Sequence, residues 1–453
     1  MKQLLMKSVS GIRGVVGKSL IPEIVLRYSS AFGIFCNKGK IVVGRDTRTS
    51  GEMLEKVVFS GLMSVGCNVI NVGICPTPTI SLMVEKLKSD GGIAITSSHN
   101  SVEWNALKFI NKNGLFLNEK MWKRLDSIYE NNKIKYADWE NLGEICNYDS
   151  AIENHIEKIL DIPYISQKKI SQKKFKVVVD CVNGAGWKII PDLLQKLGCT
   201  VYPLNCSNSG IFPHNPEPLP ENLTELCKKV RFHKADIGFA IDPDGDRLAI
   251  VDENGVPLGE DYTLTLAVKH IIEKKKGNIV VNETTTRAID DIANIHNVKV
   301  IRTKVGEIYV AQRMKEIGSP IGGEGNGGVI LSDVHLTRDA MVGITLIMQM
   351  LAEYDTSIGK LKNELPEYYI HKKKFKLSED LYNKLIKKLI KENSKKELSF
   401  IDGLKVNKKD WWIHIRKSRT EPIVRVVCEA KSEKKVKEIF REIEKNIKEY
   451  KKN

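Results

Sequence analysis

Residues 91–109 read GGIAITSSHNSVEWNALKF. The stretch begins with an apolar strand pattern at residues 93–95 and then runs into a polar cluster at residues 96–100. Open α/β sheets carry their binding and catalytic groups where a buried strand ends. The same residue types also form ordinary turns, in which Ser, His and Asn side chains satisfy backbone groups. The stretch therefore predicts an α/β fold with a candidate site, and both interpretations of the cluster stay open.

The pattern of this stretch continues in both directions along the chain. Strand-like runs alternate with amphipathic helical stretches near residues 40–95, 175–242 and 278–330. Such alternation predicts α/β layers with largely parallel sheets. After residue 366 the composition shifts toward lysine and helix, and the short strand-like runs WWIHIR and IVRVVCE follow.

We therefore predict an α/β protein with three similar mixed α/β domains and a smaller C-terminal α+β domain. The predicted domains are residues 1–150, 151–255, 256–370 and 371–453.

The composition is that of an ordinary globular protein of 453 residues, 42% hydrophobic and 28% charged. No apolar run approaches the ~20 residues of a transmembrane helix. The N-terminus lacks the apolar core of a signal peptide. The nine cysteines are scattered, with no CxxC pair, which is typical of reduced thiols. These features predict a cytoplasmic protein with no membrane partner.

The net charge of +15 raises the question of an acidic partner. The lysines are spread widely, and aromatic residues do not alternate with basic runs as they do on a base-stacking surface. At the C-terminus the lysines occupy the solvated face of a predicted helix, whose other face carries Val436, Ile439, Phe440 and Ile443. The charge therefore favours phosphorylated small molecules and predicts no nucleic-acid partner.

The sharpest chemical signal is AIDPDGDRLAIV, residues 240–251. Asp242, Asp244 and Asp246 follow a strand-like run and surround Gly245. Three carboxylates on one tight turn repel one another unless a cation neutralises them, and oxygen-only ligands select a hard ion such as Mg²⁺. A solvated acidic turn is the alternative. A calcium loop is disfavoured because Arg247 occupies the sixth position, where that loop requires Gly.

Three further stretches offer groups that bind sugars or phosphates. IGGEGNGGVI, residues 321–330, places Glu324 and Asn326 in a glycine-rich turn, where they could bind sugar hydroxyls. The stretches SGIRGVVG and VGRDTRTSGEML place arginines beside glycine turns, and Asp46 could form a structural ion pair there. HIRKSRTEPIVRV resembles a phosphate cradle in its residue types. The arginines and cradle residues are Arg13, Arg45, Arg48, Arg416, Ser418, Arg419, Thr420 and Arg425. Each stretch alone could be an ordinary turn or an exposed basic loop.

Together, TSSHN, DPDGDR, GEGNG and SRTEPIVR resemble the α-D-phosphohexomutase family, because they occur in that family's order, one per predicted domain. The resemblance extends from Ser10 to the C-terminal helix. It implies a heart-shaped four-domain architecture with the active site in a central cleft. It also implies an isomerase-type intramolecular phosphotransferase. Within the family, SGIRGVVG, HNSVEWNALKF and IGGEGNGGVI most resemble the archaeal-type phosphoglucosamine mutases.

The resemblance implies a role for each residue that matches the motifs. Phosphorylated Ser98 would give its phosphoryl group to a sugar monophosphate, and the resulting bisphosphate would turn around and phosphorylate Ser98 again. Mg²⁺ would bind a phosphate oxygen on Ser98 and the side chains of Asp242, Asp244 and Asp246. Lys108 would be the general base, with a lowered pKa. The other implied catalytic residues are His99, Arg13 and Arg247. The implied substrate-binding residues are Glu324, Asn326, Lys304, Arg416, Ser418, Arg419, Thr420 and Arg425.

The chain departs from the family pattern at several positions. Gly328 stands where many members have His, so a second acid/base candidate is missing, and His335 or His99 could substitute for it. Arg419 stands where Gly or Asn is usual. The usual Pro after SHN is Ser101, and the usual Gly before Leu-Lys is Ala106.

The predicted reaction is the interconversion of glucosamine 6-phosphate and glucosamine 1-phosphate by a monomer or homodimer. The expected ligands are hexose or hexosamine monophosphates and bisphosphates. Three alternatives stay open. They are a phosphomannomutase/phosphoglucomutase of broad specificity, a Mg²⁺-dependent sugar phosphatase and an inactive sugar-phosphate sensor.

Overall fold

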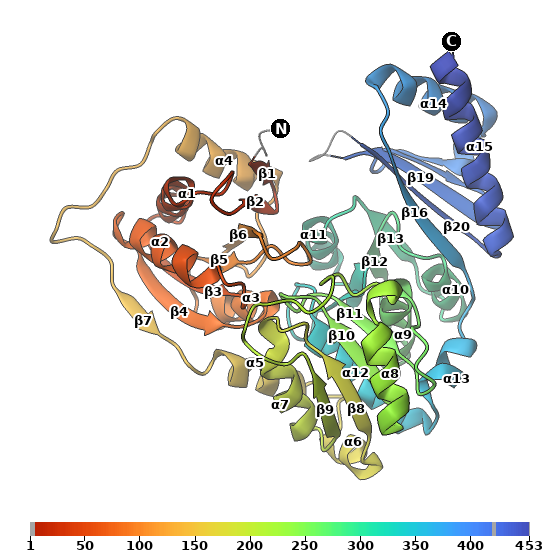
Figure 1. Ribbon diagram of the computed structural model, residues 1–453, viewed down its shortest axis with the longest axis horizontal. Coiled ribbons are helices and arrows are strands. Elements are labelled where there is room, and N and C mark those ends of the chain that lie inside the picture. Colours follow the sequence, from red (N-terminus) through yellow and green to blue (C-terminus); the bar gives the residue numbers. More distant parts are fainter. Residues whose placement is uncertain (1–4, 419–422, 453) are drawn as a thin grey trace.

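The computed structural model describes residues 5–418 and 423–452. The chain folds into four sheets, each with its own helices, which follow one another along the sequence (Figure 1). We number the domains one to four by these sheets. The first three are α/β and the fourth is α+β, as the sequence predicts.

The first domain is built on a seven-stranded sheet with the order β1-β2-β6-β5-β3-β4-β7. Strand β3 pairs in parallel with β4 and β5, whereas β5 and β6 are antiparallel. Its strands are β1 (Met6–Ser8), β2 (Gly11–Val15), β3 (Lys40–Arg45), β4 (Asn68–Ile74), β5 (Gly91–Ile95), β6 (Trp104–Asn111) and β7 (Ile145–Asn147). Its helices are α1 (Pro22–Phe35), α2 (Gly51–Met63), α3 (Thr77–Lys86) and α4 (Glu119–Glu130).

The second domain has a four-stranded sheet with the order β11-β10-β8-β9. Its strands are β8 (Lys176–Asp180), β9 (Thr200–Leu204), β10 (Ile237–Ile241) and β11 (Leu248–Val251). Its helices are α5 (Ala151–Leu160), α6 (Gln167–Lys173), α7 (Ile189–Lys196) and α8 (Thr224–His233), with short 3₁₀ turns η1 (Ala185–Trp187) and η2 (Pro220–Asn222). Apart from η2, the proline-rich loop of residues 208–223 is irregular.

The third domain repeats this plan with the strand order β13-β12-β14-β15. Its strands are β12 (Ile279–Asn282), β13 (Val300–Thr303), β14 (Ile321–Glu324) and β15 (Gly328–Leu331). Its helices are α9 (Glu260–Lys274), α10 (Ala288–Ile295), α11 (Glu307–Ile317), α12 (Ala340–Tyr354) and α13 (Ile358–Asn363).

These three sheets share one feature that the sequence did not indicate. In each domain an inner strand, β5, β10 or β14, is followed directly by an antiparallel neighbour, β6, β11 or β15. The sheets are therefore mixed, where the strand–helix alternation predicts largely parallel ones. The first two connections carry TSSHN and DPDGD, and GEGNG spans the end of β14 and the third connection, so the same topological position holds the predicted site in every domain.

The fourth domain is a five-stranded antiparallel sheet with the order β16-β20-β19-β18-β17. Its elements are β16 (Tyr369–Phe375), α14 (Glu379–Glu392), η3 (Lys395–Glu397), β17 (Leu398–Ser399), β18 (Leu404–Asn407), β19 (Trp411–Lys417), β20 (Val424–Ala430) and α15 (Glu433–Lys452). Strand β16 lies in the lysine-rich stretch that the composition assigns to helix. It is an edge strand, where lysines deter pairing with another chain. The predicted boundary between residues 370 and 371 falls inside it.

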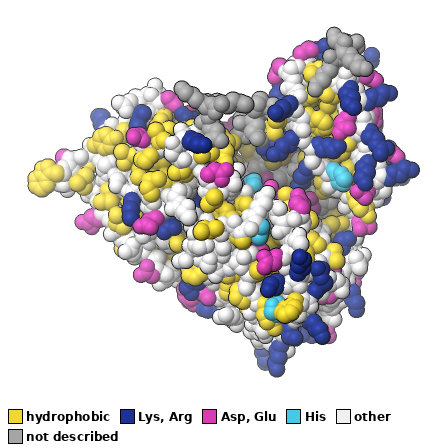
Figure 2. All heavy atoms as spheres, viewed as in Figure 1, with side chains coloured by type: hydrophobic (Ala, Val, Ile, Leu, Met, Phe, Trp, Pro, Cys, Tyr) yellow, Lys and Arg dark blue, Asp and Glu magenta, His cyan; other side chains and the backbone are white. Residues whose placement is uncertain are grey.

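The hydrophobic cores show which domains form one body. One continuous core joins Val179 of β8, Leu264 of α9 and Ile344 of α12, so the second and third domains share it. The first and fourth domains each have a core of their own. The surface is hollowed between the lobes of the first and fourth domains, which gives a heart-shaped outline (Figure 2). Among the described residues, no helix is both long and apolar enough to cross a membrane.

Candidate active site

All four domains line one cleft of about 1000 Å³. The predicted residues on its lining are Arg13, Ser98, His99, Lys108, Arg247, Glu324, Asn326, Arg416, Ser418 and Arg425. Asp242, Asp244 and Asp246 are buried in its floor. Lys304 lies outside the lining, with its Nζ 4.0 Å from Glu119. Arg419 and Thr420 lie outside the described residues.

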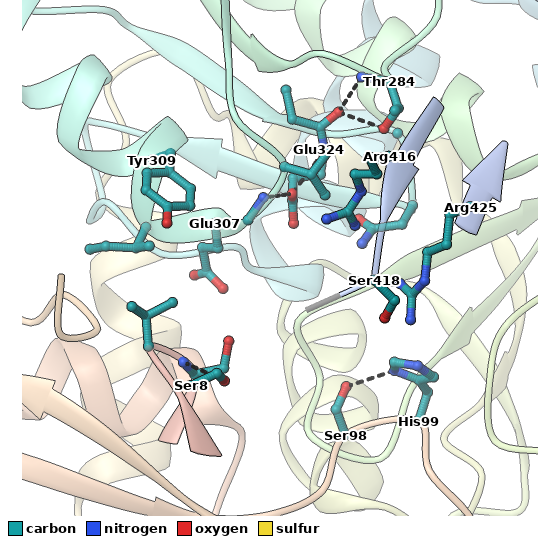
Figure 3. A pocket seen from close by; sticks show the side chains of 18 of the residues that line it. Ser8, Ser98, His99, Thr284, Glu307, Tyr309, Glu324, Arg416, Ser418 and Arg425 are labelled. Atoms are coloured by element: carbon teal, nitrogen blue, oxygen red, sulfur yellow. Dashed lines mark hydrogen bonds between the residues drawn. The ribbon is translucent and has the colours of Figure 1, made fainter. Parts of the chain in front are cut away.

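Ser98 follows β5 in a left-handed backbone conformation, with φ near 50°. This conformation is strained for a residue other than Gly, and such strain persists only where surrounding contacts fix it. The hydroxyl of Thr96 accepts a hydrogen bond from the Ser98 amide at 3.0 Å. Ser98 Oγ in turn donates to Asp242 Oδ2 at 2.8 Å and lies 3.3 Å from His99 Nδ1 (Figure 3).

Arg48 supplies most of the contacts that hold the Ser98 loop. Its side chain is fully buried and pairs with Asp46 at 3.0 Å, so the structural ion pair that the sequence allowed is present. The guanidinium donates to four backbone carbonyls of the loop, those of Ser98, Asn100, Ser101 and Trp104. Asp46 also accepts from Thr96 at 2.6 Å. The loop is thereby fixed from both ends.

The three aspartates converge at the connection between β10 and β11, where one oxygen from each lies within 4.8 Å of the others. Gly245 permits this turn, because it has a positive φ of 67°. Asp242 Oδ1 accepts the amides of Asp246 and Arg247 at 3.1 and 3.2 Å. The strand β11 follows at once, so the segment does not form a calcium loop.

Two carboxylate oxygens of this cluster are available to bind a cation. Asp244 Oδ1 and Asp246 Oδ1 are buried and have no hydrogen-bond partner among the residues that the structure describes. Buried carboxylate oxygens are normally paired, and each unpaired one costs free energy. An oxygen-only set with two such oxygens fits a hard divalent ion, so the cluster is able to bind a metal ion.

The pKa values of the aspartates show how closely the charges interact. Burial and the neighbouring carboxylates raise the pKa of Asp242 well above its usual range. Burial alone would also raise the pKa of Asp244, but Lys108 and Thr77 outweigh it and hold that pKa low. Lys108 Nζ donates to Asp244 Oδ2 at 2.5 Å. The predicted base therefore stands inside the cluster of aspartates.

The remaining predicted catalytic residues surround Ser98. Arg13 donates to Asn100 Oδ1 at 2.6 Å, next to the loop. Arg247 donates to Glu217 Oε1 at 3.0 Å. Burial, followed by the charges of Arg247 and Arg13, holds the pKa of His99 well below its usual range, so His99 is neutral at pH 7.

The motif predicted to bind the sugar differs in detail from the sequence prediction. Asn326 lies in the turn, but Glu324 is the last residue of β14, a strand that the sequence did not predict. Glu324 Oε1 accepts from the Asn282 side chain at 2.8 Å and from the Gly306 amide at 2.9 Å. These contacts fix a carboxylate that lines the cleft.

Sequence reasoning missed Arg338, which lines the cleft directly behind Glu324. Its guanidinium contacts Asp246, Glu307 and Glu324 at 2.5 to 3.1 Å. Burial lowers the pKa of Arg338, but these three carboxylates outweigh it and raise the pKa above its usual value. Burial raises the pKa of Glu307 to about 7. The available signal was Asp339, a helix-capping residue directly before an apolar run, which places Arg338 at the start of a buried helix.

His335, considered as a substitute acid/base, lies outside the cleft lining. Its Nε2 is 2.8 Å from Asp339 Oδ2, and the same oxygen contacts His155 Nε2 at 2.8 Å. His335 therefore belongs to a buried contact between the second and third domains. Of the two histidines considered, His99 is the one on the lining.

The fourth domain forms a cationic wall opposite Ser98. Arg416 and Ser418 come from β19 and its end, and Arg425 comes from β20. Figure 3 shows these side chains directed toward the space above Ser98 and His99. Arg416 lies 3.7 Å from Asp402. Lys372, Lys373 and Lys374 of β16 extend the wall.

Comparison with known families gives four consecutive matches. They are phosphoglucomutase/phosphomannomutase alpha/beta/alpha domain I over residues 5–136, domain II over 153–255, domain III over 259–369, and the C-terminal domain over 372–446.

Curated relatives and solved structures agree with these matches. A probable phosphoglucosamine mutase from Methanopyrus kandleri is 35% identical over 435 residues, 95% of each chain. A phosphoglucomutase/phosphomannomutase from Thermococcus kodakarensis is 38% identical over 438 residues, 94% of this chain and 95% of that protein. The crystal structure of a phosphoglucomutase/phosphomannomutase family protein from Burkholderia thailandensis superposes with a TM-score of 0.86 at 27% identity, covering 98% of both chains.

Proposed function

The chain belongs to the phosphoglucomutase/phosphomannomutase family, and from this premise we propose that it interconverts glucosamine 6-phosphate and glucosamine 1-phosphate through a phosphoserine at Ser98. The chain is a phosphohexomutase, an isomerase-type phosphotransferase. The choice of glucosamine and the roles of individual residues are our proposal.

The observation that carries the proposal is the position of Ser98 Oγ, 2.8 Å from Asp242 and beside two aspartates with unpaired oxygens. Asp242, Asp244 and Asp246 would hold Mg²⁺ together with a phosphate oxygen on Ser98. The ion would neutralise charge on the transferring phosphoryl group. The P–O bond to Ser98 Oγ breaks as the sugar hydroxyl bonds to phosphorus, which gives a sugar bisphosphate. After the bisphosphate has turned around, Ser98 Oγ bonds to the phosphorus of its other phosphate group. The P–O bond between that group and the sugar breaks, which frees the product hydroxyl and restores phosphoserine.

The proton of the attacking hydroxyl needs an acceptor in this floor. We assign it to Lys108, which lines the cleft, contacts Asp244 and would accept the proton as the uncharged amine. Arg13 and Arg247 stand at the same floor and would bind the phosphoryl oxygens. Neutral His99 beside Ser98 Oγ would orient that group without adding charge.

The cationic wall supports a mutase over a sugar phosphatase. A mutase must hold one phosphate while the other reacts, whereas a phosphatase needs no second phosphate site. Arg416, Ser418 and Arg425 face the Ser98 side across the cleft (Figure 3). We propose that they bind the non-reacting phosphate together with Arg419 and Thr420. Lys304 would act at the margin of the cleft.

Glu324 and Asn326 would bind sugar hydroxyls in either orientation of the substrate. The Methanopyrus kandleri relative, a probable phosphoglucosamine mutase, supports the aminosugar. A broad-specificity phosphomannomutase/phosphoglucomutase is the second candidate, and the Thermococcus kodakarensis relative, a phosphoglucomutase/phosphomannomutase, favours it. A carboxylate such as Glu324 accepts hydrogen bonds from an amine or a hydroxyl, so both sugars fit this group.

We also propose a cytoplasmic monomer or homodimer with no nucleic-acid partner. All nine cysteines are free thiols, which supports a reducing compartment. We also propose that the first three domains end at residues 150, 255 and 370.

The test is a coupled assay of purified protein with Mg²⁺ and a trace of hexose 1,6-bisphosphate. We expect the highest kcat/KM for glucosamine phosphates over mannose and glucose phosphates. Ser98→Ala should lose at least about 1000-fold in turnover, while the neighbouring Ser97→Ala keeps activity within a few-fold. Preference for mannose or glucose phosphate would replace the sugar assignment. Turnover that survives in Ser98→Ala would remove the phosphoserine mechanism.

A further inference from the structure

Arg338 is the one side chain described here that contacts both the aspartate cluster and the sugar-binding motif. Its Nη2 donates to Asp246 Oδ2 of the second domain at 2.5 Å. Its Nη1 donates to Glu324 Oε2 of the third domain at 2.8 Å, and its Nε donates to Glu307 Oε2 at 3.1 Å. The side chain is only 9% exposed. A planar guanidinium can hold three carboxylates in fixed relative positions, which a lysine cannot do.

The backbone on either side of Arg338 is also fixed. The Arg338 amide donates to Glu307 Oε1 at 2.9 Å, and the Asp339 amide donates to the Val329 carbonyl at 2.8 Å. The next amide, that of Ala340, donates at 3.2 Å to the carbonyl of Gly245. The turn that carries the three aspartates therefore contacts the start of α12. A shift of this turn would move Arg338, and a shift of Arg338 would move Glu324.

Gly328 makes room for this arrangement. A Cβ atom on Gly328 would stand 2.2 Å from Cδ of Arg338, well inside contact distance. The φ of Gly328 is not in the left-handed region, so its backbone would accept a side chain. The glycine is thus required by the arginine that passes over it, and a methyl group at position 328 would displace the guanidinium.

We propose that Arg338 is a positioning residue that couples metal binding at the aspartate cluster to sugar binding at Glu324. By holding Asp246 Oδ2, it fixes the carboxylate whose unpaired Oδ1 is available to a metal ion. By holding Glu324 Oε2, it fixes the carboxylate that meets the sugar. The inference rests on the metal and sugar roles in the proposed function, but not on which hexose is preferred.

The experiment is calorimetry on metal-free, dephosphorylated protein. Mg²⁺ is titrated with and without glucosamine 6-phosphate, and the sugar phosphate with and without Mg²⁺. In the wild type we expect each ligand to tighten the other by about fivefold or more, with equal factors in both directions. Arg338→Lys keeps the charge and loses the three-way fork. We expect its coupling factor to fall to within about twofold of one and its Mg²⁺ Kd to rise about threefold or more.

Two further variants separate positioning from general stability. Gly328→Ala removes no charged group but displaces the Arg338 guanidinium, so it should lose the coupling as Arg338→Lys does. Arg302→Lys is the matched control, because Arg302 pairs with Asp290 in the third domain and lies outside the cleft lining. It should keep the wild-type coupling even if its thermal midpoint falls.

The inference is overturned if Arg338→Lys and Gly328→Ala keep the wild-type coupling, or lose no more of it than Arg302→Lys. Independent binding of the two ligands to the wild type would also overturn it. A wild type that binds glucosamine 6-phosphate but no Mg²⁺ would instead remove the metal from the proposed function, and this inference with it.

Discussion

Two buried clusters of charged and polar side chains lie next to each other where the second and third domains meet. The cleft cluster contains Asp242, Asp244, Asp246, Lys108 and Arg338. The hinge cluster contains His155, His335, Asp339 and Thr79. Consecutive residues, Arg338 and Asp339, belong to different clusters. Both clusters bring together residues from three domains, and each contains three side chains that could bind a metal ion.

The two clusters differ in how far the protein itself satisfies them. In the hinge cluster, Asp339 Oδ2 meets both histidines, and Asp339 Oδ1 accepts the amides of Met341 and Val342 at the start of α12. In the cleft cluster, two carboxylate oxygens lack any partner among the described residues. The hinge cluster has one buried atom without a partner among the described residues, His335 Nδ1, but both oxygens of its carboxylate are paired. The unpaired carboxylate oxygens of the cleft cluster are available to a ligand. Charge type alone would not separate the two clusters, whereas the hydrogen-bond completeness of their carboxylates does.

The largest expected effect is on the cleft cluster. Asp242→Asn keeps the shape and the Oδ1 acceptor but removes a negative charge beside Ser98. We expect a loss of turnover on the order of 1000-fold, equivalent to about 4 kcal/mol in activation free energy. Because burial and repulsion raise the pKa of Asp242, the same variant should melt no lower than wild type in EDTA.

Asp252→Asn is the matched control for this prediction, since Asp252 also accepts two backbone amides in the second domain and lies outside the cleft lining. Its turnover should stay within a few-fold of wild type. A strongly destabilised Asp242→Asn protein would show that this cluster is structural like the other.

The opposite result is expected in the hinge cluster. Asp339→Asn should cost about 2–3 kcal/mol in unfolding free energy, because two histidines lose their shared carboxylate. Burial raises the pKa of Asp339, but His155 and His335 outweigh it and hold the pKa low. A lowered carboxyl pKa stabilises the fold above the unfolded value and loses this effect as pH falls.

Urea unfolding at several pH values checks this prediction. The gap between wild type and Asp339→Asn should be full at pH 6 and shrink below about pH 4. Turnover per folded molecule should change by less than about fivefold. If activity collapsed while stability held, completeness of hydrogen bonding would not distinguish structural from functional clusters.

The contacts of Arg48 test the limits of this distinction. They are complete, like those of the Asp339 carboxylate, yet they hold the loop that carries Ser98. Arg48→Lys cannot reach four carbonyls and Asp46 together. We expect kcat to fall about tenfold, or about 1.4 kcal/mol, with KM for the sugar phosphate within twofold of wild type. Steady-state kinetics and the rate of Ser98 phosphorylation by a hexose bisphosphate measure this. An unchanged kcat would make Arg48 purely structural.

How much the sequence revealed depends on how local each signal is. DPDGD places its three carboxylates within five residues, and TSSHN follows a clear apolar strand, so both were visible as chemistry. Arg338 and Asp246 are 92 residues apart, and their contact depends on how two domains pack. Arg48 and the carbonyls it binds are likewise about 50 residues apart. Contacts of this kind follow from topology, which a strand–helix pattern does not fix.

Two of the strands that the sequence did not predict, β14 and β16, have physical reasons of their own. Strand β14 reads IGGE, with two glycines and little strand propensity, and forms because β12 and β15 pair with it on both sides. Strand β16 reads YIHKKKF, whose lysines suit an edge but obscure the strand pattern. Tertiary pairing therefore overrode local propensity in both places, and one of these strands carries Glu324.

The smallest expected effect concerns Asp261 of α9, which lies beneath the sugar-binding turn. Its Oδ1 accepts the Thr286 amide at 3.0 Å and leaves no room for a side chain at Gly325. Burial raises the pKa of Asp261 to about 7. A carboxyl whose folded pKa is raised contributes stability below its unfolded value of about 4, and this contribution is lost as pH rises through 7.

Asp261→Asn keeps the acceptor and cannot ionise. Relative to wild type, it should therefore be more stable at pH 8 than at pH 6, by about 1 kcal/mol. Urea midpoints at pH 5, 6, 7 and 8 measure this difference. A constant difference across that range would place Asp261 with the fully satisfied carboxylates, in spite of its position under the sugar site.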